Sequence, residues 1–336
     1  MRLLKMGHFK RISILGDGGW GTTLAILLYN KGMDITLWSV FDDYAKILDK
    51  KRHNINFLKG VKIPRGIRIT SDLQEALSCD LVVLAVPSLY LRQVLVKGKK
   101  YYPKSVPVVS VVKGIENGTL LRMSEVVWEL WHSPDVAVLS GPTIAQELAR
   151  KIPTAAVVAS GNKRLMLELQ DLFMTPFFRI YANPDVTGVE VGGSLKNIIA
   201  IACGISDGLK FGTNTKAAIL SRGLAEIARL GVCMGGKIET FFGMTGLGDL
   251  VTTCFNPLSR NHFVGQKIGE GHSLNKVIAR MKMVAEGVPT TKSVYMLGKK
   301  LHVDLPITNE IYNVLFKRRP PLTAVKRLMQ REKKAE

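Results

Sequence analysis

Acidic residues are scarce in this chain of 336 residues. It contains 27 Asp and Glu against 47 Lys and Arg, which gives a formal net charge of +20 at neutral pH. A charge of this size is typical of proteins that bind nucleic acids or other anionic surfaces. Hydrophobic residues still make up 46% of the chain, which excludes a disordered polyelectrolyte. At roughly 100–200 residues per domain, the length predicts two folded domains.

Cysteines are also few, and they lie far apart in the sequence. The four are Cys79, Cys203, Cys233 and Cys254. There is no C-x-x-C pair, and the histidines show no metal-ligand spacing. This pattern excludes a disulfide scaffold, predicts no metal site and favours reduced thiols in a cytoplasmic protein.

Long apolar runs are missing. No run reaches the roughly 18 residues that a membrane-spanning helix needs. The basic amino end, residues 1–10, is not followed by the apolar stretch of roughly 7–15 residues that a secretory signal contains. We therefore expect a cytoplasmic protein without an integral membrane segment.

The first half of the chain alternates β-rich and helical segments. Buried strands are predicted at 12–15, 35–38, 80–86, 106–112, 136–139 and 154–159. Helices are predicted at 20–30, 120–131, 143–150 and 162–172. This alternation predicts an α/β domain of the Rossmann type over residues 1–185, with helices covering a mostly parallel sheet.

From Val186 onward the pattern changes. We find no convincing strand up to about Gln330, only helical segments broken by Gly and Pro. The helices predicted here are 189–206, 215–234, 274–281, 290–300, 307–316 and 323–331. We therefore predict an all-α C-terminal domain over residues 186–336.

A glycine-rich loop follows the first predicted strand. The segment from Gly16 to Gly21 matches G-x-G-x-x-G between a strand and a helix. In this pattern Gly16 permits a tight turn, Gly18 lets the backbone approach a pyrophosphate, and Gly21 allows close packing of helix and strand. Free N–H groups at the helix start can then bind the pyrophosphate. A tight turn without a ligand would look the same, but the position of the motif favours dinucleotide binding.

The usual determinant of coenzyme choice is missing. In NAD enzymes an acid about 20 residues further on, at the end of the second strand, binds the ribose 2′-hydroxyl. Here that strand ends in Trp38-Ser39-Val40-Phe41, and Asp42 and Asp43 come a few residues late. Asp17 places a negative charge near the expected pyrophosphate unless its side chain points to solvent. An NADP-type arginine is not evident either, so NAD and NADP both stay open.

Together with other motifs, this loop resembles the NAD(P)-dependent glycerol-3-phosphate dehydrogenases of the bacterial type. The resemblance extends from about residue 11 to residue 329, and the order and spacing of its motifs make it specific. The motifs are GDGGWGT at 16–22, VKGIE at 112–116, LSGPT at 139–143, GVEVGGSLKN at 188–197, GLGDLVTTC at 246–254, SRN at 259–261 and VAEG at 284–287.

The resemblance implies reversible hydride transfer between NAD(P)H and dihydroxyacetone phosphate, giving sn-glycerol 3-phosphate for phospholipid synthesis in a cytoplasmic homodimer. It makes the helical domain the substrate-binding and catalytic part, with Lys196 as proton donor and acceptor. The substrate residues it implies are Lys113, Gly141, Thr143, Asp249, Ser259, Arg260 and Asn261. The coenzyme contacts it implies are Gly19, Trp20, Lys113, Ala145, Arg260, Val284 and Glu286.

The residues themselves permit this chemistry. Lys196 opens an apolar helical segment, where burial would lower its pKa from about 10.4 toward the neutral range useful in acid–base catalysis. The alternative is a lysine that reaches solvent from the helix face. Asp249 follows a flexible Gly-Leu-Gly backbone and either holds the Lys196 ammonium or caps a helix. Asn197 and Thr253 would add polar contacts.

Anion-binding groups follow the same motifs. Arg260 offers a planar fork for a phosphate with Ser259 and Asn261 as further donors, or the three form a surface turn. Lys113 ends a strand at the edge where ligands bind open α/β sheets, or it is a solvated loop residue. Glu286 either binds the nicotinamide amide or caps a turn.

The segment from Gly141 to Thr143 lies between a strand and a helix start, which is a natural anion site.

Other classes of protein compete with this interpretation. Another β-hydroxyacid-type dehydrogenase would share the architecture, but the SRN and GLGDL motifs argue against it. A non-catalytic dinucleotide sensor would lack Lys196 or Asp249. A nucleic-acid-binding module would show a recognised motif or aromatic residues among basic ones, and we find neither.

The excess positive charge lies mainly in residues 46–68, 92–104 and 317–336. These segments contain no predicted site residue, so we predict solvated surfaces that attract the anionic coenzyme and substrate. Weak contact with anionic lipid headgroups is a further hypothesis.

Overall fold

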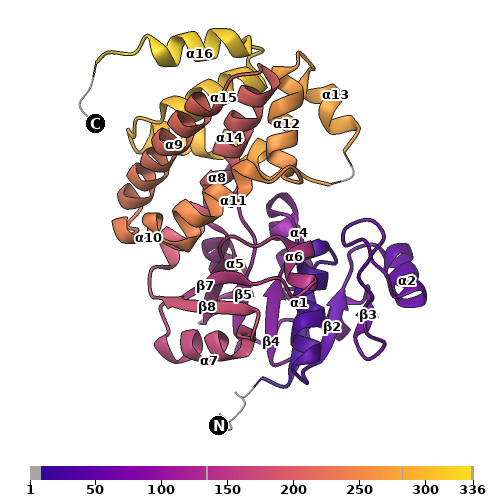
Figure 1. The fold of residues 1–336 in the computed structure, drawn as a ribbon. Coiled ribbons are helices and arrows are strands. Elements are labelled where there is room, and N and C mark those ends of the chain that lie inside the picture. Colours follow the sequence, from indigo (N-terminus) through magenta and orange to yellow (C-terminus); the bar gives the residue numbers. More distant parts are fainter. Residues whose placement is uncertain (1–8, 134, 282, 334–336) are drawn as a thin grey trace. The chain divides into compact units, whose positions relative to one another are not determined.

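The structure is a computed structural model that describes residues 9–133, 135–281 and 283–333 (Figure 1). The chain divides into two compact units. The first comprises Met1–Lys113 and Arg122–Val186, and the second comprises Gly114–Leu121 and Thr187–Glu336. Residues 114–121, which the sequence analysis places in the first domain, therefore group with the helical unit.

The first unit is built on one sheet. Its strands are β1 (Arg11–Leu15), β2 (Asp34–Trp38), β3 (Arg68–Thr70), β4 (Leu81–Leu84), β5 (Val108–Ser110), β6 (Val136–Ser140), β7 (Thr154–Ser160) and β8 (Phe178–Asn183). Within the described residues their order is β3-β2-β1-β4-β5-β6-β7-β8. Every neighbouring pair is parallel except β6 and β7, which are antiparallel. The predicted Rossmann-type, mostly parallel sheet is thereby confirmed.

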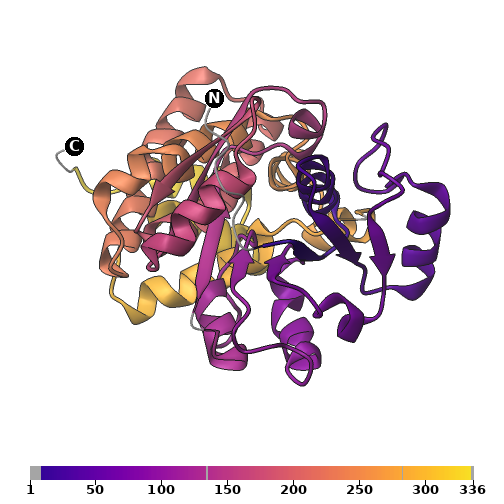
Figure 2. The ribbon, with the colours of Figure 1, turned by 90° about the horizontal axis from the view of Figure 1, so that it is seen from below.

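Helices cover both faces of this sheet. They are α1 (Gly19–Asn30), α2 (Asp42–Lys51), α3 (Leu73–Ala76), α4 (Ser88–Gly98), α5 (Met123–Trp131), α6 (Ala145–Ala149) and α7 (Lys163–Phe173). Figure 2 shows α1 and α7 on one side of the sheet and α4 and α5 on the other. The central strand β4 is buried over its whole length because both of its faces are covered.

The strand order contains a topological switch point. After β1 the chain adds β2 and β3 on one side, and β4 then pairs with the other side of β1. The loops that follow β1 and β4 therefore diverge, and ligands of open α/β sheets bind at such a point. The glycine-rich loop leaves β1 there.

The second unit consists of helices and loops, with no strand among its described residues, which confirms the all-α prediction. Its helices are α8 (Val186–Gly208), α9 (Thr213–Cys233), α10 (Ile238–Phe242), α11 (Asp249–Phe255), α12 (Arg260–Gly269), α13 (Leu274–Ala279), α14 (Gly287–Lys300), α15 (Pro306–Phe316) and α16 (Pro321–Met329). A π-helical turn, Met244–Gly248, leads directly into α11.

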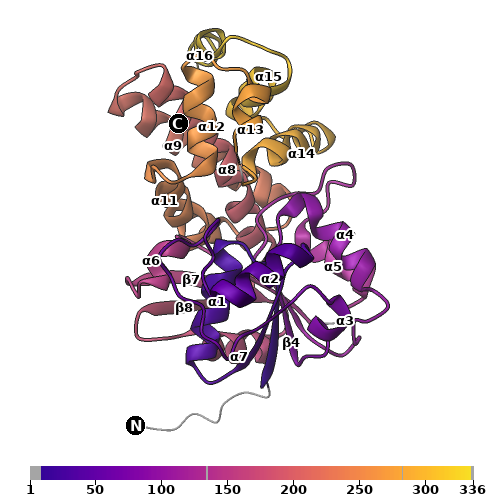
Figure 3. The same ribbon diagram turned by 90° about the vertical axis from the view of Figure 1, so that its right-hand side faces the viewer.

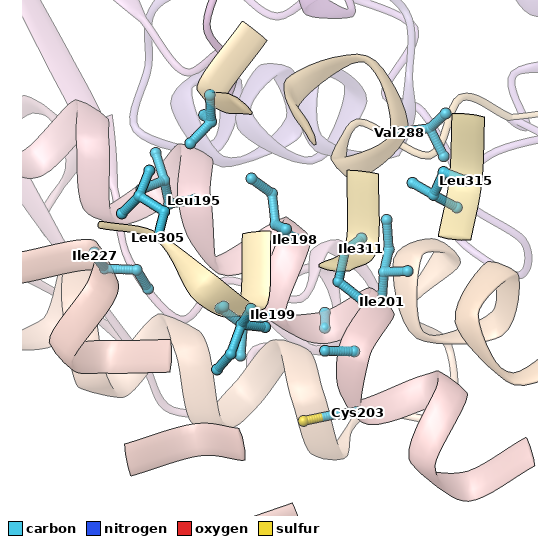
Figure 4. Packing of buried hydrophobic residues seen from close by; sticks show 14 of the residues in the cluster. Leu195, Ile198, Ile199, Ile201, Cys203, Ile227, Val288, Leu305, Ile311 and Leu315 are labelled. Carbon is cyan, nitrogen blue, oxygen red and sulfur yellow. The ribbon is translucent and has the colours of Figure 1, made fainter. Parts of the chain in front are cut away.

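The long helix α8 forms the centre of this unit (Figure 3), and every residue from Gly188 to Ser206 is buried. Figure 4 shows α8 side chains packed among those of neighbouring helices; the labelled members of this core include Leu195, Ile198, Ile199, Ile201, Ile227, Leu305 and Ile311. Glycines let the neighbours approach closely, since a Cβ on Gly204 would lie 2.0 Å from the carbonyl oxygen of His262. By length and composition α8 could cross a membrane, but its apolar window is 100% buried inside the protein, as in a core helix.

Candidate active site

The glycine-rich loop is closely packed at both ends. Gly16 has a φ of +127°, and a Cβ there would lie 2.6 Å from the carbonyl carbon and oxygen of Ala85. A Cβ on Gly21 would lie 2.0 Å from the carbonyl oxygen of Gly16. Side chains at these two positions are therefore excluded by the turn itself and by the approach of α1 to the sheet.

Between these glycines the loop is open. Nothing lies within 4 Å of a Cβ built on Gly18. Gly18 is the N-cap of α1, no described side chain caps that terminus, and its first turn contains no acid. The N–H groups and the positive end of the helix dipole are thus available to an anion. These residues fit the pyrophosphate of a dinucleotide.

Three predicted coenzyme contacts lie around this opening. A Cβ on Gly19 would be 3.7 Å from the Cβ of Ala145, at the start of α6, and 2.5 Å from the carbonyl oxygen of Phe57. The Trp20 ring packs edge-on against Phe178, with ring centroids 6.3 Å apart. The structure therefore brings Gly19 and Ala145 together and anchors Trp20 against the sheet.

A buried asparagine supports the loop from the side. Asn54 donates through Nδ2 to the carbonyl oxygen of Asp17 (2.7 Å) and to Thr22 Oγ1 (2.8 Å). Its Oδ1 accepts hydrogen bonds from the Tyr44 hydroxyl (2.8 Å) and the Phe57 N–H (3.0 Å). Asn54 belongs to the basic segment 46–68, for which the sequence analysis predicts a solvated surface. That prediction is wrong for Asn54.

Lys113 and Thr143 converge on one carbonyl oxygen. Lys113 Nζ donates to Gly141 O at 3.0 Å, and Thr143 Oγ1 donates to the same atom at 3.1 Å. These three predicted substrate residues thus lie together beyond the ends of β5 and β6, and Lys113 is half-buried rather than fully solvated. Helix α6 begins only at Ala145 and has five residues, so the helix start expected at 143 is not present.

In the helical unit, Lys196 of α8 is buried and paired. Its Nζ donates to Asp249 Oδ1 and, at 2.6 Å, to Thr253 Oγ1. The Thr253 hydroxyl donates to the carbonyl oxygen of Asp249 at 2.7 Å. The side chains of Lys196 and Asp249 are only 8% and 1% exposed. A lysine that reaches solvent is therefore excluded, and so is a capping Asp249, because the N-cap of α11 is Gly248.

The π-helical turn before α11 brings the side chain of Asp249 close to α8. A Cβ on Gly192 of α8 would lie 2.5 Å from the carbonyl oxygen of Thr245 in this turn. Asp249 and Thr253 are four residues apart on α11 and so share one face. The close approach that Gly192 permits thus places both side chains against Lys196.

Two buried thiols lie beside this pair. A hydrogen bond with Cys203, together with burial, raises the pKa of the Cys254 thiol well above its ordinary value. Cys254 therefore stays protonated near neutral pH and does not act as a base beside Lys196.

A second polar chain crosses the same unit. Asn261 donates through Nδ2 to Asn197 Oδ1 (2.9 Å) and accepts through Oδ1 from the Gly287 N–H (2.9 Å). It joins α8, α12 and α14, and both asparagines are buried. Ser259 Oγ accepts from the His262 N–H at 3.3 Å as the N-cap of α12. The SRN motif is thus the start of a helix and not a surface turn.

Arg260 lies with the two predicted coenzyme residues of the VAEG motif. This exposed arginine donates through Nη1 to the carbonyl oxygen of Val284 at 2.8 Å. The charge of Glu286 acts on the same guanidinium. Glu286 stands at the N-cap position of α14, but its side chain makes no capping hydrogen bond, which removes the capping alternative.

Comparison with known proteins agrees with this arrangement over both units. Residues 11–166 match the N-terminal part of NAD-dependent glycerol-3-phosphate dehydrogenase, and residues 185–326 match its C-terminal part. Glycerol-3-phosphate dehydrogenase (NAD(P)+) of Thermoanaerobacter sp. is 51% identical over 327 residues, which are 97% of this chain and 98% of that protein.

The corresponding enzyme of Maridesulfovibrio salexigens is 47% identical over 329 residues, or 97% of this chain and 100% of that protein. The crystal structure of glycerol-3-phosphate dehydrogenase from Coxiella burnetii has a TM-score of 0.93 at 36% identity, covering 96% of this chain and 99% of that one. The chain therefore belongs to the NAD-dependent glycerol-3-phosphate dehydrogenase family.

Proposed function

We propose that this protein is an NAD(P)-dependent glycerol-3-phosphate dehydrogenase. It reversibly reduces dihydroxyacetone phosphate to sn-glycerol 3-phosphate. The observation that carries the proposal is the buried contact of Lys196 with Asp249 and Thr253, in a chain that matches the family over both units. Lys196 and Asp249 lie in two of the motifs that carry the family resemblance, GVEVGGSLKN at 188–197 and GLGDLVTTC at 246–254.

Coenzyme binding is assigned first to the glycine-rich loop. When bound, NAD(P)H supplies the hydride. The N–H groups at the start of α1, next to Gly18, bind the pyrophosphate because no described side chain competes for them. The other coenzyme contacts we assign are Gly16, Gly19, Trp20, Gly21, Lys113, Ala145, Arg260, Val284 and Glu286.

Lys196 is assigned as the proton donor in reduction and the proton acceptor in oxidation. One proton to the carbonyl oxygen and one hydride to the carbonyl carbon convert the ketone to the alcohol. Asp249 and Thr253 fix the direction of the ammonium, which general acid catalysis requires because the donor must lie within hydrogen-bond reach of the substrate atom.

The substrate phosphate is assigned to Arg260, whose guanidinium provides parallel donors for two phosphate oxygens. The remaining substrate residues we assign are Lys113, Gly141, Thr143, Asn197, Ser259 and Asn261. Dihydroxyacetone, which lacks the phosphate, should therefore be a poor substrate. The test is a comparison of kcat/KM for the two ketones with NADH and NADPH. Equal values for both ketones would refute the phosphate assignment.

We also infer that the enzyme works in the cytoplasm as a homodimer and supplies glycerol phosphate for phospholipid synthesis. The family resemblance supports each of these inferences. Sedimentation velocity tests the assembly, and a monomer at micromolar concentration would contradict it. Loss of glycerol phosphate from lipid synthesis in a deletion strain tests the role of the product.

Weak contact with anionic lipid is assigned to α16. Leu322 and Met329 are exposed on this helix two turns apart, and Lys326 and Arg327 lie between them. A basic helix with exposed apolar side chains is suited to an anionic membrane surface. Co-sedimentation with vesicles of phosphatidylglycerol tests this, with phosphatidylcholine vesicles as the control. Absence of binding at low salt would refute it.

A further inference from the structure

Asp17, the second residue of the glycine-rich loop, does not point into solvent. Its Oδ2 accepts a hydrogen bond from Ser39 Oγ at 2.7 Å. Ser39 directly follows the last residue of β2 and is fully buried. The Asp17 carboxylate therefore lies at the carboxyl end of β2, the place where the sequence has no acid of its own.

Several hydrogen bonds hold Asp17 and Ser39 in this position. The Phe41 N–H donates to Ser39 Oγ at 3.3 Å. The Ser39 hydroxyl has two acceptors within reach, the Phe41 carbonyl oxygen at 3.2 Å and Asp17 Oδ2 at 2.7 Å, and the carboxylate is the nearer one. On the backbone of Asp17, the carbonyl oxygen accepts from Asn54 Nδ2 (2.7 Å) and Thr22 Oγ1 (3.2 Å). A carboxylate fixed in this way costs little further ordering when it binds a ligand.

The negative charge of Asp17 has no cationic partner. Among residues 9–133, 135–281 and 283–333, no basic side chain forms an ion pair or hydrogen bond with it. Two nearby basic side chains have other partners, since Lys46 on α2 pairs with Asp42 and Arg52 just after it pairs with Asp49. Burial raises the pKa of the Asp17 carboxyl, and the bond from Ser39 opposes that shift.

Asp42 and Asp43, the acids that follow β2, do not take the place of the missing carboxylate at the end of this strand. Asp42 accepts from the Ser71 hydroxyl at 2.7 Å through Oδ1 and from Lys46 through Oδ2. Both of its oxygens thus already have partners. Asp43 is exposed on α2. Asp17 is therefore the acid that lies where NAD enzymes have a carboxylate at the end of the second strand.

We propose that Asp17 selects NAD(H) over NADP(H) by accepting the adenosine ribose 2′-hydroxyl and repelling a 2′-phosphate. This inference rests on the proposed function, because it requires a dinucleotide along the glycine-rich loop. A hydroxyl can donate to the carboxylate, whereas a phosphate monoester brings about −1.5 to −2 charges against it. Repulsion of the wrong ligand is a common source of specificity.

The test is coenzyme binding without substrate, measured by fluorescence titration of NADH and of NADPH. The wild type should bind NADH at least about tenfold more tightly than NADPH, a ratio that about 1.4 kcal/mol of repulsion produces. Asp17→Asn keeps the shape and an oxygen for Ser39 but removes the charge. It should reduce this ratio about tenfold, chiefly through tighter NADPH binding. Asp43→Asn removes the same charge from α2 and should leave the ratio unchanged.

Different results overturn different claims. A wild type that binds NADPH as tightly as NADH, or an Asp17→Asn variant with an unchanged ratio, would refute the inference and leave the dehydrogenase intact. An equal effect of Asp43→Asn would also refute it, because the selectivity would then come from general charge. Binding of neither coenzyme by the wild type would refute the proposed function itself. Thermal unfolding of each variant shows that the loop change has not unfolded the protein.

Discussion

Replacing Asp249 with Asn should destabilise this protein strongly, although the two side chains have nearly the same shape. The change leaves the Lys196 ammonium, 8% exposed, without the carboxylate that now accepts its hydrogen bond. Breaking a buried ion pair by removal of one partner costs about 3–5 kcal/mol, because the other charge stays buried. Thr253 Oγ1 remains as an acceptor, so we expect the lower end of this range.

The assay is urea unfolding at neutral pH for the wild type, Asp249→Asn, Lys196→Met and the double variant. Each single change leaves one buried charge without the opposite charge of this pair, whereas the double change removes both charges. The double variant should therefore lose less stability than the sum of the single variants, by at least about 2 kcal/mol. Asp42→Asn is the matched control, since its pair with Lys46 is largely exposed and should contribute little to stability.

The reasoning would be refuted by additive losses, or by an Asp249→Asn loss no larger than that of Asp42→Asn. Either result would mean that the Lys196 ammonium is not held by Asp249 in solution.

Three further predictions concern single residues. Glu226 is buried against the start of α15, where it accepts from the N–H groups of Ile307 and Thr308, and burial raises its pKa from 4.5 to about 7. Because the unfolded chain releases this proton near pH 4.5 and the folded chain near 7, the free energy of unfolding should fall by up to about 3 kcal/mol as the pH rises between these values. In urea titrations at several pH values, Glu226→Gln should lose this pH dependence. A Glu226→Gln variant with the same pH dependence as the wild type would contradict the prediction. Asn54→Ala should cost about 1–3 kcal/mol of stability and weaken NADH binding, since it leaves buried groups unsatisfied; an unchanged Kd would show that the loop does not need this support. Gly16→Ala should abolish NADH binding in a fluorescence titration, because its Cβ meets the Ala85 backbone at 2.6 Å, and near-normal binding would refute the packing argument.

Much of the architecture follows from sequence pattern alone. Buried parallel strands such as β4 are continuous apolar runs, and the glycine-rich loop has a fixed relation to the strand and helix around it. Short or polar elements escape such reasoning. The strand β3 has only three residues, and α2 is rich in Lys and Asp, so neither shows a clear apolar pattern. Most of α2 also lies in the segment 46–68, whose charge favours a surface.

The contacts of the site likewise divide into those that the sequence predicts and those that it does not. Lys196 and Asp249 are 53 positions apart, so their contact could be expected only from a family resemblance, and the structure supplies it as a hydrogen bond. The pairing of Asp17 with Ser39 depends on the neighbouring register of β1 and β2, which no local pattern contains. The role of Asn54 depends in the same way on a loop that folds back onto the start of α1.

The most direct test of the central claim is NADH oxidation with dihydroxyacetone phosphate by the wild type and by Lys196→Met, with NADH binding measured in parallel. The wild type should turn over and yield sn-glycerol 3-phosphate. The variant should lose about 10²–10⁴-fold in kcat, the usual contribution of a positioned acid–base group, while it still binds NADH. Absence of turnover by the wild type with both NADH and NADPH would contradict the assigned activity, and near-full turnover by Lys196→Met would contradict the assigned role of the lysine.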